Sequence, residues 1–430
     1  MEFKIFKYPF ALMLASFSLL QTADAQTPVA EISKLSQEVS VLRKQGPSGL
    51  QLFLKSHRNT LDINSSDAVL PSSALRVALD ELCQQRDCYA SRLYWYTDIE
   101  QAKAAARTSG KPILSLRLLG RLDQDLSCAN SRFFRVALYP NGEISKLLQD
   151  HFILHWQSVR PVPKVTIDFG DGRKLERTIT GNSIHYILDA SGRPIDAIPG
   201  LYSPREFLRQ LQQAEVAVKD YSKLAKSDRG AFLRKYHSDR LNSIQAQWVA
   251  DLSRLGIQSP PKLVKVPSNP SQPPTAERAS SLAVSKMRVE TPMLSAFQSD
   301  AERNQNALAE ITDQEVWNKI AQLYAADVKL DQNSISLIRA KKSQPVNTKE
   351  DNLPIIVKKF ETTMALDTVR NEYMLHSQIH QWFMQGKQTS SVEALNEQVY
   401  AQLFLTPSFD PWLGLFPSDS YSAIDNDGIR

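Results

Sequence analysis

The sequence contains few of the residues that mark common classes of site and compartment. Only 3 of its 430 residues are cysteine and 15 are glycine. After the first 25 residues, no apolar run approaches the length of a membrane-spanning helix, so we expect no membrane span. We find no nucleotide-binding fingerprint, no Ser-His-Asp arrangement distinguishable from chance, and no internal repeat. Gly170-Asp171-Gly172 predicts a hairpin turn rather than a phosphate loop, because no helix follows it.

Charge of one sign is not concentrated anywhere in the chain. The 51 lysines and arginines exceed the 46 aspartates and glutamates by five, and they are spread along the sequence. Proteins that bind nucleic acid usually carry a concentrated basic stripe. We therefore predict no nucleic-acid partner.

The N-terminus has the pattern of a secretory signal. Lys4 and Lys7 precede a short apolar core at residues 10–20, and Ala23-Asp24-Ala25 is a small-x-small cleavage site. This pattern predicts a cleaved signal peptide at residues 1–25. The mature protein is then expected to be periplasmic or secreted, with no membrane span after cleavage.

Three cysteines are an odd number for an exported protein, in which cysteines are usually paired. Cys83 and Cys88 are five positions apart, and a disulfide between them requires the preceding helix to end near Arg86. Such a bridge leaves Cys128 free. The alternative is that all three are buried, unreactive thiols.

Composition and periodicity divide the chain into regions. We predict a signal peptide at 1–25, an N-terminal helical region at 26–90, an α/β domain at 91–216, a helical extension at 217–256, a proline-rich linker at 257–275 and a helical C-terminal domain at 276–430. In the α/β domain we expect strands at 93–96, 113–116, 152–156, 165–169, 175–179, 184–188 and 194–198.

Residues 95–211 resemble the thioredoxin superfamily. The matching pieces are Ala102 to Ala106, Lys111-Pro112-Ile113-Leu114, Cys128 to Ser131, Glu143-Ile144, Phe152-Ile153 and the strand and turn at 184–192. The resemblance implies a central mixed sheet flanked by helices. It places Cys128 where the family has its nucleophilic cysteine and Ser131 where the family has the second cysteine. Asn182 and Ser183 occupy the place of the family's cis-proline loop. A single thiol there implies mixed disulfides with a protein or a small thiol.

The residues around Cys128 affect its reactivity in opposite directions. Ser127 is expected to cap a helix whose first turn contains Cys128, where unpaired N–H groups stabilise a thiolate. Asp123 and Asp125 oppose a further negative charge. His185 is two residues beyond Ser183 on the same strand and therefore on the same face, so it is a candidate partner of Cys128. The alternative for His185 is a core histidine bonded to the backbone. A thiol role also requires that Cys128 faces solvent.

A second candidate site lies near the C-terminus. Glu372, His376 and His380 recur every fourth residue, so a helix places them on one face, where two histidines can bind one transition metal. The alternative is ordinary solvated or interhelical polar contacts. No other cofactor is indicated.

Three functional hypotheses follow. The first is a thiol role for Cys128, with Ser131 as its hydrogen-bond donor. The second is a non-catalytic interaction module with a vestigial site, for which the apolar tail at 410–416 is either a packed strap or a docking segment. The third is metal binding at residues 372–380. The sequence leaves enzymatic activity open.

Overall fold

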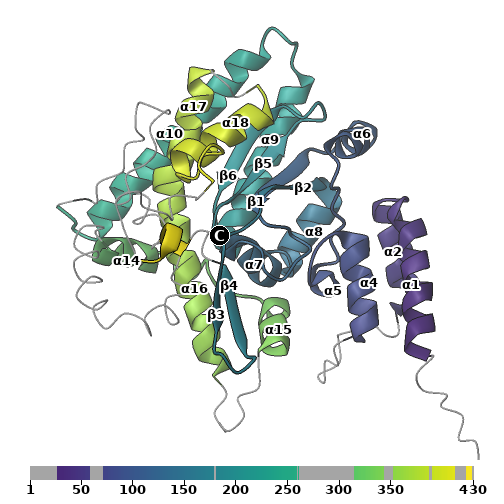
Figure 1. The fold of residues 1–430 in the computed structure, drawn as a ribbon. Helices are drawn as coiled ribbons and strands as arrows, with labels where there is room; N and C mark the ends of the chain where they lie inside the picture. Colours follow the sequence, from purple (N-terminus) through teal and green to yellow (C-terminus); the bar gives the residue numbers. More distant parts are fainter. Residues whose placement is uncertain are drawn as a thin grey trace, which may run out of the picture.

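A computed structural model of the chain describes residues 27–58, 71–178, 181–258, 260, 314–342, 352–386, 390–411 and 423–428. The predicted signal peptide and nearly all of the predicted linker at 257–275 lie outside these ranges. The chain combines a mixed α/β region with many helices (Figure 1).

Helices near the N-terminus form a small bundle at one side of the molecule (Figure 1). They are α1 (Thr27–Arg43), α2 (Pro47–Ser56), α4 (Ser73–Cys83) and α5 (Cys88–Ser91). The Ser72 hydroxyl caps α4 by accepting from the Leu75 N–H at 3.3 Å. The helix ends at Cys83 because Gln84 adopts the left-handed conformation, with φ of 54°. The apolar faces of these helices form a core of their own that includes Leu50, Phe53 and Leu79.

A four-stranded mixed sheet lies at the centre of the molecule. Its strands run in the order β2-β1-β5-β6, and the bounds are β1 (Ile113–Leu119), β2 (Ile153–Arg160), β5 (Ser183–Leu188) and β6 (Pro194–Pro199). β1 and β2 are parallel, whereas β5 is antiparallel to both β1 and β6. A separate hairpin consists of β3 (Lys164–Asp168) and β4 (Lys174–Thr178). The strand predicted at 93–96 is wrong, since Tyr96 makes only an isolated bridge to His155.

Helices cover both faces of the sheet. Every residue of β1 is buried, as expected for a central strand with an almost continuous apolar sequence. The connecting helices are α6 (Ile99–Ser109), α7 (Ala129–Phe133), the π-helix η1 (Phe134–Leu138), α8 (Gly142–His151) and α9 (Pro204–Lys223). His185 of β5 contacts Phe134 and Phe207, whereas the adjacent Tyr186 bonds to Asn396. Because neighbouring strand residues point to opposite faces, η1 and α9 cover one face and the C-terminal helix containing Asn396 covers the other.

Most of the remaining helices pack onto this α/β region. They are α10 (Arg229–Arg254), α14 (Gln314–Gln322), α15 (Gln332–Lys341), α16 (Leu353–Arg370), the π-helix η4 (Asn371–His376), α17 (Ser377–Gln385), α18 (Val392–Gln398) and the π-helix η5 (Val399–Leu403). The short 3-10 helix η6 (Asp425–Gly428) follows near the C-terminus. Trp317, Met364 and Phe383 belong to the same hydrophobic core as the sheet. The described helices of the predicted C-terminal domain at 276–430 therefore do not form a separate unit.

Candidate functional site

Cys128 lies at the start of a helix, as its place in the sequence predicts. It is the N-cap residue of α7, one position later than the predicted cap Ser127. Its backbone N–H donates to the Leu119 carbonyl at 3.1 Å, which ties the helix start to the end of β1. The Ser131 hydroxyl donates to the Cys128 carbonyl at 2.9 Å. Cys128 and Ser131 are thus adjacent, as expected.

The environment of the thiol differs from the expectation of a solvent-facing site. Cys128 is fully buried and is part of the main hydrophobic core. Burial raises the pKa of the Cys128 thiol and outweighs the opposing effects of the Ser131 hydrogen bonds and the Arg132 charge. Helix α7 has only five residues before it becomes a π-helix, which limits the dipole that stabilises a thiolate. The solvent-facing thiol that the redox hypothesis requires is absent.

The other predicted residues of this site play structural roles. Asn182 is connected to Cys128 through Leu119, whose N–H donates to the Asn182 carbonyl at 3.4 Å. Ser183 begins β5 and is buried. The Nε2 atom of His185 lies 2.8 Å from the Tyr139 hydroxyl, so its hydrogen bond is to that side chain rather than to Cys128 or to the backbone. Burial lowers the pKa of His185 to about 3, which makes it a neutral core histidine.

The C-terminal segment, defined here as residues 390–411, covers this region. The Tyr400 hydroxyl donates to the Asn182 carbonyl at 3.2 Å, and the Asn182 side chain donates to the Thr406 hydroxyl at 3.0 Å. Tyr400 is buried in the same hydrophobic core as Cys128. The segment therefore contributes to the core that contains the thiol.

A second cluster, made of side-chain types that can ligate a metal, lies at β6, the strand next to β5 at the edge of the sheet. Asp196 of β6, His376 at the end of η4 and His380 of α17 each offer a ligand atom, and these atoms lie within 4.8 Å of one another. All three residues are buried. The two imidazole rings are one helical turn apart, with centroids separated by 4.2 Å. The expectation that His376 and His380 share a face is confirmed.

Hydrogen bonds determine which nitrogen of each histidine is left with a lone pair. The His376 Nδ1 atom lies 2.9 Å from Glu372 Oε2, and since a carboxylate only accepts, Nδ1 carries the proton. His237 Nε2 lies 3.1 Å from the Ile195 carbonyl and must donate, which leaves His237 Nδ1 as the acceptor for His380 Nδ1 at 2.8 Å. Within the described residues, the Nε2 atoms of His376 and His380 have no hydrogen-bond partner. Metal-ligating histidines have this arrangement, with one nitrogen held by an outer partner and the other facing the metal.

Asp196 provides the negative charge of the cluster. Its Oδ2 accepts from the Tyr236 hydroxyl at 2.5 Å, and its Oδ1 accepts from the Ala197 N–H at 2.8 Å. Oδ1 also lies 3.5 Å from His376 Nε2. Burial alone would raise the pKa of Asp196, but the close contact with His376 and the charges of the nearby histidines outweigh burial and lower it. Asp196 is therefore an ionised carboxylate inside the protein, where a charge needs a cation beside it.

The protonation states of the two histidines differ. Burial lowers the pKa of His376, but the carboxylates of Glu372 and Asp196 more than compensate and raise it to about 9. Burial lowers the pKa of His380 well below its usual range, and the charge of His376 adds to this effect. Without a metal, a proton on His376 neutralises Asp196. A divalent cation that replaces this proton would meet two nitrogen lone pairs and one carboxylate oxygen.

Glu372 was predicted as a metal ligand, and the structure assigns it a different place. It bonds to the nitrogen of His376 that faces away from the cluster, and it accepts from the Tyr202 hydroxyl at 3.2 Å. Its carboxylate thus orients His376 rather than completing the triad. Sequence reasoning missed Asp196, which is 180 positions before His376 and is brought beside it only by the packing of η4 on β6.

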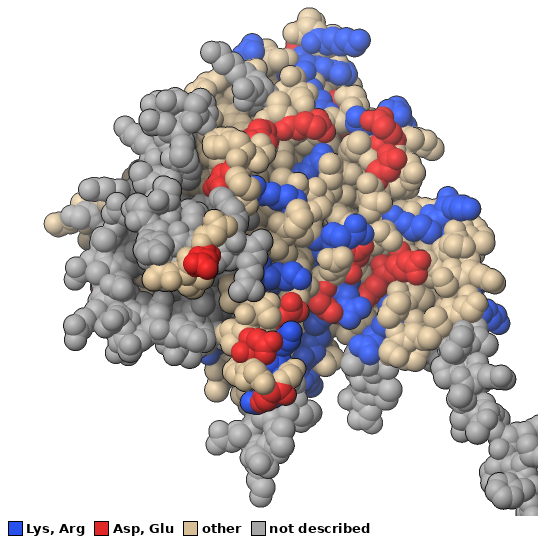
Figure 2. All heavy atoms as spheres, in the orientation of Figure 1, with Lys and Arg blue, Asp and Glu red and all other residues tan. Residues whose placement is uncertain are grey.

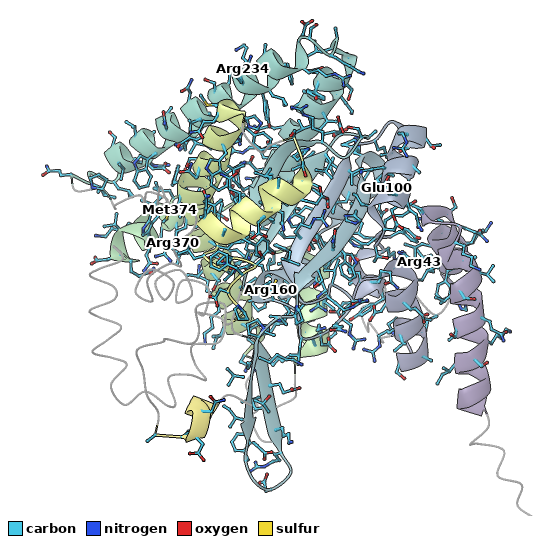
Figure 3. The ribbon with its side chains drawn as sticks, turned by 45° about the horizontal axis from the view of Figure 1, so that its top comes forward. Arg43, Glu100, Arg160, Arg234, Arg370 and Met374 are labelled. Carbon is cyan, nitrogen blue, oxygen red and sulfur yellow. A yellow bond between two sulfur atoms is a disulfide. The ribbon has the colours of Figure 1, made fainter. Side chains whose placement is uncertain are left out.

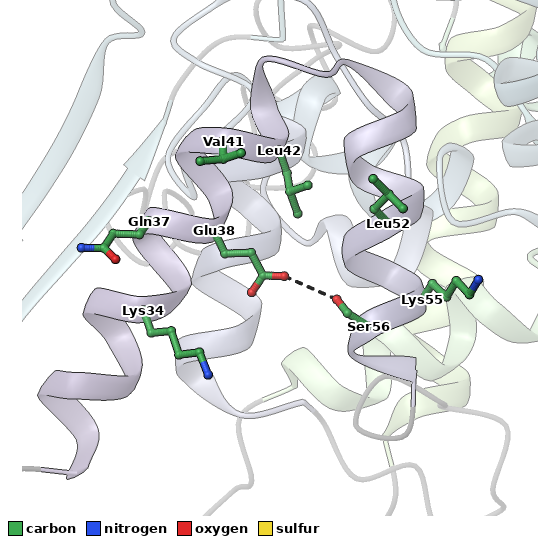
Figure 4. A pocket seen from close by; sticks show the side chains of 8 residues that line it. All are labelled: Lys34, Gln37, Glu38, Val41, Leu42, Leu52, Lys55 and Ser56. Atoms are coloured by element: carbon green, nitrogen blue, oxygen red, sulfur yellow. Dashed lines mark hydrogen bonds between the residues drawn. The ribbon is translucent and has the colours of Figure 1, made fainter.

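Other features of the described surface give weaker evidence of a binding site. A groove between α1 and α2 is lined by Lys34, Gln37, Glu38, Val41, Leu42, Leu52, Lys55 and Ser56 (Figure 4). Its polar groups include the Ser56 hydroxyl, which donates to Glu38 at 3.4 Å, and they do not converge on a buried point. On the face drawn in Figure 2, basic and acidic side chains are interspersed. Among the described helices, none is both long and apolar enough to cross a membrane.

Comparison of the sequence and the structure with known proteins finds no match. No family model, no curated protein and no solved structure matches the chain. Any function therefore has to be inferred from the residues themselves.

Proposed function

We propose that this chain is a transition-metal-binding protein built on a thioredoxin-like scaffold, with Asp196, His376 and His380 as the metal ligands. The observation that carries the proposal is the convergence of one nitrogen from each of two histidines and one carboxylate oxygen within 4.8 Å, together with two buried Nε2 atoms that have no hydrogen-bond partner among the described residues. Their outer atoms are already engaged by Glu372, His237 and Tyr236. Preorganised outer partners of this kind fix ring orientation and raise metal affinity.

The donor set indicates the class of metal. Two imidazoles and one carboxylate suit Zn²⁺ and neighbouring divalent transition metals, whereas Mg²⁺ and Ca²⁺ prefer sites made of oxygen ligands. The site is buried and joins two regions that are far apart in the sequence: β6 and the continuous helical stretch of η4 and α17. This position favours a structural ion that fastens the C-terminal helices to the sheet over a catalytic one that meets a substrate.

The scaffold assignment is supported by the order of the elements. A parallel βαβ unit of β1 and β2 is followed by an antiparallel ββα unit of β5, β6 and α9, and all four strands belong to one mixed sheet. The helix that begins at Cys128 comes directly after the first strand of this arrangement, as the sequence resemblance implies. Thiol exchange is not part of the proposal, because catalytic cysteines need a stabilised and accessible thiolate.

Export to an oxidising compartment belongs to the same proposal. Cys83 and Cys88 are joined by a disulfide in the structure, and Cys128 is the free cysteine. Structural disulfides persist mainly in secreted or periplasmic proteins. The pattern at residues 1–25 supports the same location.

Zinc titration of the purified full-length protein, by calorimetry and by elemental analysis after dialysis, tests the metal site. We expect one equivalent of Zn²⁺ to bind. His380→Gln and Asp196→Asn should each weaken binding by more than the 10–100-fold typical of outer-partner mutations. His151→Gln is the matched control, since this histidine is bonded to Glu215 on the surface and should leave binding unchanged.

Equally weak zinc binding by wild-type protein and a ligand variant would contradict the proposal. If wild-type protein and the folded His380→Gln variant bind equally little zinc, the cluster is a buried His376–Asp196 ion pair and the proposal fails. Circular dichroism establishes that each variant is folded before its affinity is compared.

A further inference from the structure

The hairpin of β3 and β4 has an unpaired strand edge. It forms a two-stranded sheet of its own, and within the described residues no strand pairs with the outer edge of β3. The turn end of the hairpin points away from the central sheet (Figure 1; Figure 3). Two strands alone are marginally stable in water, and an exposed strand edge is a template for pairing with a further strand. The outer edge of β3 is therefore a candidate interaction surface.

Apolar side chains share one face of the hairpin without joining a hydrophobic core. Val165 and Ile167 of β3 lie on the same face as Leu175 of β4, because Ile167 is directly opposite Leu175. All three are half-buried, and none belongs to the hydrophobic clusters of the described residues. Phe169, which follows β3, is 54% exposed. The described chain thus covers this apolar face incompletely.

The hydrogen-bond pattern of the hairpin shows which main-chain groups of β3 face outward. The Phe169 N–H donates to the Arg173 carbonyl at 3.1 Å, so these two residues form a hydrogen-bonded pair. Bonded and unbonded pairs alternate along an antiparallel ladder. The odd-numbered residues of β3 therefore turn their main-chain groups toward β4, and the even-numbered residues turn theirs to the free edge. These outward residues are Lys164, Thr166 and Asp168, and all three are exposed.

The side chains of β3 are self-complementary about Thr166. Consider an antiparallel pairing of β3 with β3 of a second copy, centred on Thr166. It places Lys164 opposite Asp168 of the second copy, and the two-fold axis repeats this pair at the other end. On the apolar face it places Val165 opposite Ile167. Oppositely charged pairs and apolar pairs directly across two strands stabilise a sheet.

The outer edge of β4 lacks this complementarity. The equivalent two-fold pairing of β4 is centred on Glu176 and places this residue opposite Glu176 of the second copy. Like charges directly opposite each other are destabilising. The same pairing sets Arg177 opposite Leu175, which is neither an ion pair nor an apolar pair. The charge pattern therefore favours β3 over β4 as the pairing edge.

We infer that the chain forms a two-fold dimer in which β3 of one copy pairs with β3 of a second copy. The two hairpins then make one antiparallel sheet in the order β4-β3-β3-β4. Main-chain bonds at Lys164, Thr166 and Asp168 hold the two copies, and the ion pairs between Lys164 and Asp168 fix the register. The strand is five residues long, so the interface is small and we expect a dissociation constant in the micromolar range. The inference does not depend on metal binding.

Sedimentation equilibrium of the full-length protein at several concentrations tests the inference, with EDTA present so that no metal bridges two copies. Thr166→Pro removes the N–H at the centre of the new ladder, and because this N–H faces away from β4, the hairpin keeps its own bonds. We expect dimerisation to weaken at least tenfold, or about 1.4 kcal/mol. Glu176→Pro is the matched control. It changes the residue directly opposite Thr166 in the hairpin and should leave the dissociation constant unchanged.

Cysteine cross-linking measures the register and needs no proline. In a hydrogen-bonded antiparallel pair the Cα atoms are about 5.5 Å apart, which a disulfide can span. Diamide should therefore convert Thr166→Cys into a disulfide-linked dimer on a non-reducing gel. Glu176→Cys, on the other edge, should form at least tenfold less dimer. The native cysteines should not interfere, since Cys83 and Cys88 are bridged and Cys128 is buried.

Three results would overturn the inference. A wild-type protein that stays monomeric would show that the charges of Lys164 and Asp168 protect the edge from association. Equal effects of the two proline variants, each shown to be folded by circular dichroism, or equal cross-linking of the two cysteine variants, would place the interface elsewhere. Assemblies larger than a dimer would indicate that β3 pairs with β4 of the next copy, an arrangement that does not close.

Discussion

The Nδ1 atoms of His237 and His380 lie 2.8 Å apart, and this hydrogen bond fixes the orientation of His380. Because His237 uses its other nitrogen to donate to the Ile195 carbonyl, it can only accept from His380. The Nε2 atom of His380 therefore keeps its lone pair, and among the described residues it has no hydrogen-bond partner. His237 also stacks on Phe383, with ring centroids 4.1 Å apart, so its own position is fixed by packing.

Replacing His237 by phenylalanine should weaken metal binding without unfolding the protein. The new ring keeps the stacking on Phe383 but removes the acceptor for His380 Nδ1. We expect zinc affinity to fall by roughly 10–100-fold, the usual cost of losing an outer partner of a ligating histidine. Calorimetry on both proteins measures the change, and His237→Gln, which retains a polar group, should recover part of the affinity. Unchanged affinity in His237→Phe would show that His237 does not position the site.

The metal site could be predicted only in part. His376 and His380 share a face because they are one helical turn apart, which is a local property that the sequence displays. Asp196 depends on a contact between β6 and η4, and a single aspartate in a short strand carries no signal of that contact. Glu372 has the same spacing as a ligand, so its role as the partner of the outer nitrogen of His376 could not be predicted from spacing.

Cys128 should react slowly in the native protein. Its thiol is fully buried and its pKa is raised, so alkylation requires local opening. An opening free energy of about 3 kcal/mol slows labelling by about 100-fold relative to an unfolded chain. Iodoacetamide labelling followed by mass spectrometry, with and without urea, measures the ratio. A native rate within a few-fold of the denatured rate would favour the thiol hypothesis.

The disulfide should make a moderate contribution to stability. Cys83 and Cys88 are separated by five positions, and closing so short a loop stabilises the folded state by about 2 kcal/mol in the chain-entropy description. Replacing both cysteines by alanine should lower the free energy of unfolding by about that amount, as measured by urea denaturation. The Cys128→Ala variant serves as a comparison that keeps the bridge. A double variant as stable as wild type would mean that the bridge adds nothing to the capped end of α4.

Helix caps, turn residues and hydrophobic periodicity in the sequence account for most of the helices and strands that could be predicted. Asp98 caps α6 by accepting from the N–H groups of Glu100 and Gln101, and Gly110 ends the helix in the left-handed conformation. Both the cap at Asp98 and the helix end at Gly110 could be predicted from the sequence. The strand expected at 93–96 failed because its aromatic residues pack into the core without a neighbouring strand to pair with along their length. The shared core of the sheet and the C-terminal helices could not be predicted, since it depends on contacts between residues far apart in the chain.

The buried neutral histidines should make the protein sensitive to acid. Burial lowers the pKa of His185 to about 3, and burial followed by the Arg117 charge lowers that of His155 to about 3. Between these values and the usual pKa of about 6.5, the unfolded chain binds protons that the folded chain does not, so stability falls as the pH decreases. Each histidine contributes about 1.4 kcal/mol per pH unit in this window. Asp80, whose pKa burial raises to about 6, opposes this trend.

A difference measurement isolates one histidine from these opposing groups. His185→Phe fits among Phe134 and Phe207 and cannot be protonated. It leaves the Tyr139 hydroxyl without its partner, which lowers stability equally at every pH. Urea unfolding at pH 7, 6 and 5 should therefore show a dependence on pH that is shallower than in wild type by about 1.4 kcal/mol per unit below pH 6.5. Identical slopes in the two proteins would show that His185 is protonated in the folded state, contrary to its burial.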